Sequence, residues 1–138
     1  MNVKFALTPM AVVLCALAAA TSGAVLAEVR SLAMLDRVEA GEWELRSREQ
    51  GQPPRRLCMR DARQLIQLRH AGENCQRTVV DDTADQITVQ YTCHGRGYGR
   101  TQIRRESESL VQIDTQGIAA GRPFAFAIEA RRVGGCGA

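Results

Sequence analysis

Apolar and polar residues alternate with a period of two over most of the chain after Gly41, the pattern of strands with one buried face. Trp43 and Leu45 alternate with charged residues in the first such segment, and the apolar positions of the last begin at Phe124. The segments that this pattern predicts as strands are residues 41–46, 55–60, 75–80, 86–94, 98–105, 110–115 and 124–130.

Turn-forming residues separate these segments. Pro53 ends the first strand, and a charged stretch centred near Thr83 makes residues 75–80 and 86–94 a hairpin. Gly95 begins the next turn, and Gly117 and Gly121 are expected to end the strand before the last.

The pattern predicts one helix, of about nine residues. Asp61 is a good N-cap, and Gly72 is a good stop. His70 falls at the helix C-terminus, where a histidine cation is favoured by the helix dipole. The apolar face of this helix is formed by Ala62, Leu65, Ile66 and Leu68.

Short strands at nearly regular spacing with one helix predict a mainly β fold: a small antiparallel meander sheet, either curled or closed into a barrel. We expect residues 41–138 to form this single β-rich domain. Residues 28–40 precede it as a lead-in, in which Leu32, Leu35 and Val38 suit either a short amphipathic helix or a loosely ordered segment.

The start of the chain predicts export. Lys4 precedes an uncharged apolar run. The positions that a signal peptidase reads, Val25 to Ala27 before Glu28, carry small or modest side chains. We expect residues 1–27 to be a cleaved signal peptide, which places the protein in the periplasm with no stable membrane span. The alternative is an uncleaved anchor, because the uncharged stretch is long enough to cross a bilayer.

Four cysteines follow the predicted signal, an even number in a compartment where disulfides persist. If residues 75–80 and 86–94 form a hairpin, Cys75 and Cys93 lie opposite one another and Cys58 is left to reach Cys136. The rival pairing, Cys58 with Cys75 and Cys93 with Cys136, stays open. The four cysteines are widely spaced and form no paired C-x-x-C units, so we expect neither a metal site nor a cofactor.

The charge of the exported part argues against nucleic acid as a partner. Residues 28–138 carry 17 arginines and all 15 acidic residues, a net charge of only +2. A nucleic-acid-binding domain needs a concentrated and strongly basic face.

The candidate binding residues are His94, Tyr98, Arg100 and Arg104, on the polar face of the predicted sheet. Arginine forks, a phenol and an imidazole together suit a carboxylate or phosphate ligand. The competing interpretation is an ordinary solvated sheet face. No acid, base and nucleophile set with recognisable spacing stands out, so no catalytic residue is predicted.

Several pieces of the chain together resemble the uncharacterised bacterial family catalogued as domain of unknown function 3617. They are residues 41–45 around Trp43, Cys58 followed by an acid-capped helix, Cys75 opening a strand, Cys93 closing one, and residues 131–136 ending at Cys136. The resemblance implies a periplasmic or envelope location and brings no established activity.

Two functions follow as hypotheses. The first is an exported, non-catalytic β-domain that binds a small apolar or anionic ligand, or an envelope protein, on a curled sheet. The alternative is a periplasmic hydrolase with a site around His94, Tyr98 and Arg100.

Overall fold

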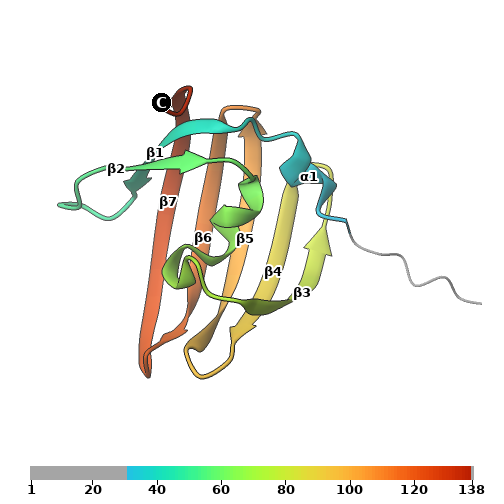
Figure 1. Ribbon diagram of the computed structural model, residues 1–138, viewed down its shortest axis with the longest axis vertical. Helices are drawn as coiled ribbons and strands as arrows, with labels where there is room; N and C mark the ends of the chain where they lie inside the picture. The colour runs from blue at the N-terminus through green and yellow to red at the C-terminus, as the bar shows by residue number, and fades with distance from the viewer. Residues whose placement is uncertain (1–30, 138) are drawn as a thin grey trace, which may run out of the picture.

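A computed structural model of the protein describes residues 31–137, which form one open antiparallel sheet with two short helical segments (Figure 1). Along the chain the elements are α1 Ala33–Asp36, β1 Gly41–Ser47, β2 Arg55–Met59, the 3-10 helix η1 Ala62–His70, β3 Cys75–Asp82, β4 Gln86–Cys93, β5 Gly97–Ser107, β6 Leu110–Ala119 and β7 Arg122–Gly134. All seven predicted strands are confirmed. Residues 1–27, the predicted signal peptide, lie outside the described part of the chain.

The strands follow the order β2-β1-β7-β6-β5-β4-β3. From β3 to β7 the chain is the predicted meander, in which each strand pairs with the next. β1 pairs with β7 rather than with β3, and β2 lies outside β1. The sheet therefore has two edges, β2 and β3, and of the two predicted forms it takes the open one.

One face of this sheet carries the hydrophobic core. In β4 the buried apolar residues are Ile87, Val89, Tyr91 and Cys93, the four that the alternation assigns to one face. Thr88, which the alternation assigns to the other face, is buried as well. η1 and α1 lie across this inner face (Figure 1), and η1 contacts β4, β5 and β6. Leu32, Leu35 and Val38 of the lead-in also belong to the core.

Trp43 is fully buried, and its indole Nε1 donates to Glu39 O at 3.0 Å. This bond attaches the end of the lead-in to β1. The buried lead-in residues and this bond hold the segment on the sheet, together with hydrogen bonds from Leu32 N–H to Asp82 Oδ2 at 3.1 Å and from Glu39 N–H to Glu108 O at 3.0 Å.

The predicted helix is present, with Asp61 as its N-cap accepting from the Arg63 N–H at 2.8 Å, but it is a 3-10 helix. Gln67 has non-helical angles (φ −126°, ψ 46°) that interrupt the regular turn. Its side-chain amide donates to His70 O at 3.0 Å and Glu73 O at 2.7 Å. Here the Gln67 side chain, rather than backbone N–H groups of the helix, binds these two carbonyl oxygens. The apolar pattern of the sequence does not reveal this arrangement.

The prediction that Gly117 ends a strand was wrong, because β6 continues to Ala119. Gly117 lies opposite Gly99 of β5 and Phe124 of β7. A Cβ at Gly117 would stand 2.1 Å from Tyr98 O, so the glycine here permits close backbone approach inside the sheet rather than a turn.

The two disulfides are Cys75–Cys93 and Cys58–Cys136, with Cα atoms 4.2 Å and 5.4 Å apart. Cys75 and Cys93 are direct cross-strand partners, as the hairpin register predicts. The first of the two pairings considered is therefore confirmed. No helix among residues 31–137 is long and apolar enough to cross a membrane.

Candidate functional site

The predicted binding residues are only partly brought together. Tyr98, Arg100 and Arg104 are exposed on the outer face of β5, opposite the core, while His94 lies in the turn between β4 and β5. Arg104 Nη1 pairs with Glu106 Oε1 at 2.9 Å. Arg100 has no carboxylate partner among the described residues, which leaves its guanidinium free to bind another group.

Tyr98 and Arg100 line one groove, of about 380 Å³, on the outer face. Gln90 and Gln116 also line it, in register with Arg100 on the neighbouring strands. His94 and Arg104 do not line this groove. Of the four predicted binding residues, this groove therefore contains Tyr98 and Arg100, with the side-chain amides of two glutamines beside them.

A second groove, of about 460 Å³, opens on the inner face, between the end of β1, the loop before β2, η1 and β7. We call it the Phe126 groove. Its apolar lining includes Leu45, Pro53, Leu68, Phe126 and Ile128, and its polar lining includes Glu49, Arg55 and Arg69. Phe126 and Leu68 are half-buried and pack against the core, so the groove is a solvent-open extension of the core.

The cations beside this groove are not neutralised by the protein. Arg55 and Arg69 form no ion pair with any described residue, whereas most other arginines of the domain do. A groove with an apolar floor and unpaired arginines suits a ligand that is apolar in one part and anionic in another. Sequence reasoning missed Arg55 and Arg69, because Arg55 begins β2 and Arg69 lies near the end of η1, and only the fold brings both to one groove.

A third groove, of about 420 Å³, continues the outer face towards β7. Arg100 lines it together with Gln102, Gln116 and Ala127, and Arg48 closes an ion pair with Asp114 across the same face. Glu49, Ala125 and Phe126 line both this groove and the Phe126 groove. The two therefore lie on opposite faces of the same stretch of β7.

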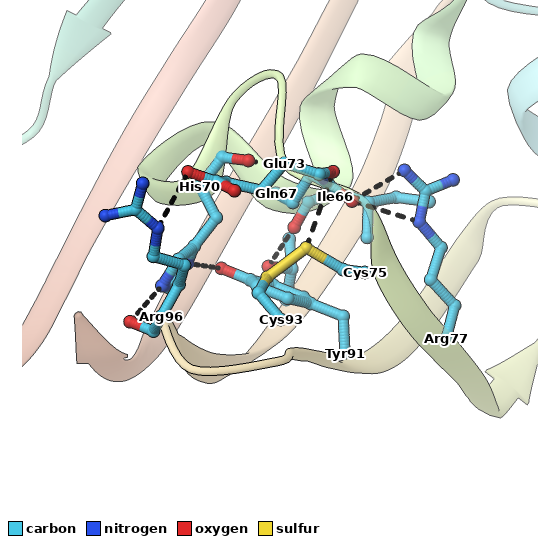
Figure 2. Close-up of a disulfide and its surroundings, with 10 residues drawn as sticks. Ile66, Gln67, His70, Glu73, Cys75, Arg77, Tyr91, Cys93 and Arg96 are labelled. Carbon is cyan, nitrogen blue, oxygen red and sulfur yellow. Dashed lines mark hydrogen bonds and ion pairs between the residues drawn. A yellow bond between two sulfur atoms is a disulfide. The ribbon is translucent and has the colours of Figure 1, made fainter. Parts of the chain in front are cut away.

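A buried polar cluster joins η1 to the sheet beside the Cys75–Cys93 disulfide (Figure 2). His70 is 5% exposed and lies between Tyr91 and Arg96. Its Nε2 is 3.4 Å from Arg96 O, an atom that only accepts, so Nε2 is the donor of this pair. Nδ1 is hydrogen-bonded to the Tyr91 hydroxyl at 3.1 Å.

Further bonds satisfy the rest of this cluster. Gln67 Oε1 accepts from Arg77 Nη2 at 2.7 Å, and Thr101 Oγ1 donates to Ile66 O at 2.6 Å. Burial raises the pKa of Tyr91, and a hydrogen bond from Thr115 lowers it by less. With its groups paired to one another, the cluster is built to hold η1 in place.

His70 therefore does more than the helix-end role that its position suggests. It contacts the ring of Tyr91 edge-on, with centroids 5.4 Å apart, and the ring of Phe124 at 6.0 Å. Residues 31–137 contain no group of three His, Cys, Asp or Glu side chains that could hold a metal ion.

Comparison with known proteins places the chain in a family and no further. No curated protein and no solved structure matches it. The sequence model of the family described as protein of unknown function (DUF3617) matches residues 38–136, from the lead-in to the last cysteine. The chain belongs to the DUF3617 family.

Proposed function

We propose that this protein is an exported, non-catalytic binding protein of the periplasm or cell envelope, with the Phe126 groove as its binding surface. The observation that carries the proposal is the groove itself: an apolar floor formed by Leu68 and Phe126, open to solvent and flanked by Arg55 and Arg69. Ligand sites in small β-domains have this composition, mostly apolar with a few polar groups that fix orientation.

Two disulfides support export, because they persist in oxidising compartments and are rare in the cytosol. The residue pattern of the first 27 positions, a cation followed by an apolar run and a small-residue end, supports it independently.

The arrangement of polar groups favours binding over the alternative of a hydrolase. His94 lines none of the three grooves described above, and the hydrogen bonds of the described residues do not connect it to Tyr98 or Arg100. The histidine that is held in a defined position, His70, has both ring nitrogens occupied by Tyr91 and Arg96.

The test uses the fluorescent anion anilinonaphthalene sulfonate, whose rings and sulfonate match an apolar groove with cations beside it. We expect the folded parent protein to enhance its fluorescence. Phe126→Gln should weaken binding about tenfold, since that factor corresponds to about 1.4 kcal/mol of lost apolar contact. The matched control is Val133→Gln, an apolar side chain that is 44% exposed elsewhere on β7.

Both variants are first compared by thermal melting, so that dye binding to a loosened fold is recognised. Equal binding by Phe126→Gln and the parent would contradict the proposal. Native mass spectrometry of the protein recovered from a periplasm adds the natural ligand: a co-purified mass that the parent retains and Phe126→Gln loses would identify its class.

The outer groove supports a second candidate, capture of a small anion by Tyr98 and Arg100. Arg100 lacks a carboxylate partner among the described residues and Tyr98 is 49% exposed, so both can bind a ligand without losing an internal contact. Inorganic phosphate and citrate are suitable probes. Arg100→Ala should abolish their binding, Arg104→Ala should leave it intact because Arg104 is already paired with Glu106, and binding should weaken as salt rises.

A further inference from the structure

One stretch of β7 is a sheet edge in the middle of the domain. β6 pairs with β7 from Ala119↔Arg122 to Leu110↔Arg131. On its other side, β1 pairs with β7 only from Gly134 to Ile128, followed by one bond from Arg48 N–H to Ala127 O. Residues 122–126 therefore have a strand on one side alone, as the lower part of β7 shows in Figure 1.

The backbone of this stretch presents hydrogen-bonding groups to the open side. In an antiparallel ladder, successive residues direct their N–H and C=O groups alternately to the two neighbouring strands. Because Ala127 O accepts from Arg48, the groups of Ala125 and the C=O of Pro123 point the same way, beyond the end of β1. Pro123 lacks an N–H, so the open segment offers one donor and two acceptors.

Both faces of the sheet are hollowed beside this edge. The Phe126 groove lies on the inner face and the groove of Arg100 on the outer face, and Ala125 lines both. An added strand would lie about 4.8 Å from β7, with successive side chains pointing to opposite faces. One set of side chains would then enter the Phe126 groove, and the other would lie over Ala125 in the outer groove.

The charge beside the edge is positive. Three arginines that line the two grooves, Arg55, Arg69 and Arg100, have no carboxylate partner among the described residues. The two grooves contain two acidic residues, Glu49 and Asp114, and Asp114 is already paired with Arg48. Glu49 is therefore the one acid that offsets the charge of the three arginines. This imbalance favours a partner that carries acidic side chains.

We infer that residues 122–126 of β7 bind an extended, acidic segment of a partner protein by strand addition, with alternate apolar side chains in the Phe126 groove. The inference rests on the proposed function and names the partner of the same groove. The short open segment and Pro123 limit the added ladder to a few bonds, so the side chains in the two grooves select the sequence.

The test uses an acetylated and amidated peptide of alternating glutamate and leucine, about seven residues long. A second peptide has the same sequence with its backbone nitrogens methylated on one edge, and a third, methylated on the opposite edge, shows which edge faces β7. Calorimetry on the full exported domain measures binding. We expect one methylated peptide to bind about tenfold more weakly than the unmethylated one, and a lysine-leucine peptide to bind more weakly still.

Two variants of the protein complete the design. Ala125→Pro removes the one donor that faces the open edge and should weaken the glutamate-leucine peptide about tenfold. Arg100→Glu should weaken it as well, while the matched control Arg60→Glu, an exposed arginine without an ion pair among the described residues, should not. If Ala125→Pro lowers the melting temperature, the methylated peptides still decide the question with the parent protein.

Equal binding of the methylated and unmethylated peptides would overturn strand addition. If no peptide binds while anilinonaphthalene sulfonate still binds the parent and is lost in Phe126→Gln, strand addition fails and the proposed function stands. If the dye also fails to bind, both fail. A dimer of the parent that Ala125→Pro converts to a monomer would identify the occupant as a second copy of the chain and would likewise overturn the inference.

Discussion

Gly99 and Tyr91 form the most stringent test of packing in this fold. They are cross-strand partners on β5 and β4, and the Tyr91 ring lies over the glycine. A Cβ at position 99 would stand 2.5 Å from both Cζ and Oη of Tyr91, closer than a carbon atom can approach. Gly99→Ala must therefore displace a side chain that is 1% exposed and hydrogen-bonded to His70.

The cost follows from what the ring loses. Overpacking of a well-packed core costs about 1–3 kcal/mol, and removal of a large aromatic side chain costs about 3–5 kcal/mol. We expect Gly99→Ala to lower the free energy of unfolding by about 3 kcal/mol, the value at which these two ranges meet. In a Tyr91→Ala background the clash is gone, and the same change should be neutral or stabilise by about 0.5 kcal/mol, because alanine is less costly than glycine in a strand.

Urea unfolding, followed by the fluorescence of Trp43, measures all four members of this double-mutant cycle. Trp43 is the one tryptophan of the chain and is fully buried, so its emission reports the core. Gly134→Ala is the control, since a Cβ there meets no atom within 4 Å. Additive effects, or a Gly99→Ala midpoint equal to that of the parent, would show that the Tyr91 ring does not lie over Gly99.

Four further predictions concern stability and the two disulfides. Burial raises the pKa of Tyr91, so the unfolded chain releases the phenolic proton first and the free energy of unfolding falls as pH rises above about 10. Tyr91→Phe should flatten this alkaline loss, which urea unfolding midpoints across that pH range measure. Trp43→Ala should cost about 3–5 kcal/mol, and an unchanged melting curve would contradict its burial. The mature protein should gain four hydrogens in mass on reduction and show no free thiol before it. Loop-closure entropy predicts that Cys58–Cys136, which spans 78 positions, stabilises the fold by about 4.5 kcal/mol. Cys75–Cys93, which spans 18 positions, should contribute about 3 kcal/mol. Replacing Cys58 and Cys136 by serine should therefore lower the melting temperature more than replacing Cys75 and Cys93.

The strands were predictable because one face of each is buried, and burial on one face imposes a period of two. The same regularity gave the register of Cys75 with Cys93, since a hairpin with a turn near Thr83 leaves little freedom. Gly117 shows where this reasoning ends. Its role inside β6 comes from the close approach of Tyr98 O on the neighbouring strand β5. The local sequence pattern does not contain such a contact between strands.

The candidate site was less predictable for a related reason. Tyr98 and Arg100 share one groove because they are two residues apart on one strand, a relation that alternation does contain. Arg55 and Arg69 come to the Phe126 groove from β2 and η1, and that meeting depends on β1 pairing with β7. His70 and Tyr91 likewise meet only because η1 folds back across the inner face.

The open edge of β7 is a consequence of unequal strand lengths and of one disulfide. β7 has 13 residues and β1 has seven, so β1 covers only part of β7 wherever it pairs. Cys58–Cys136 links β2 to the segment just after β7, and this holds the β1–β2 hairpin at the C-terminal part of that strand. The uncovered part is then the one that begins at Arg122 and contains Phe126, and the covalent bond that stabilises the fold also determines which apolar side chains remain open to a partner.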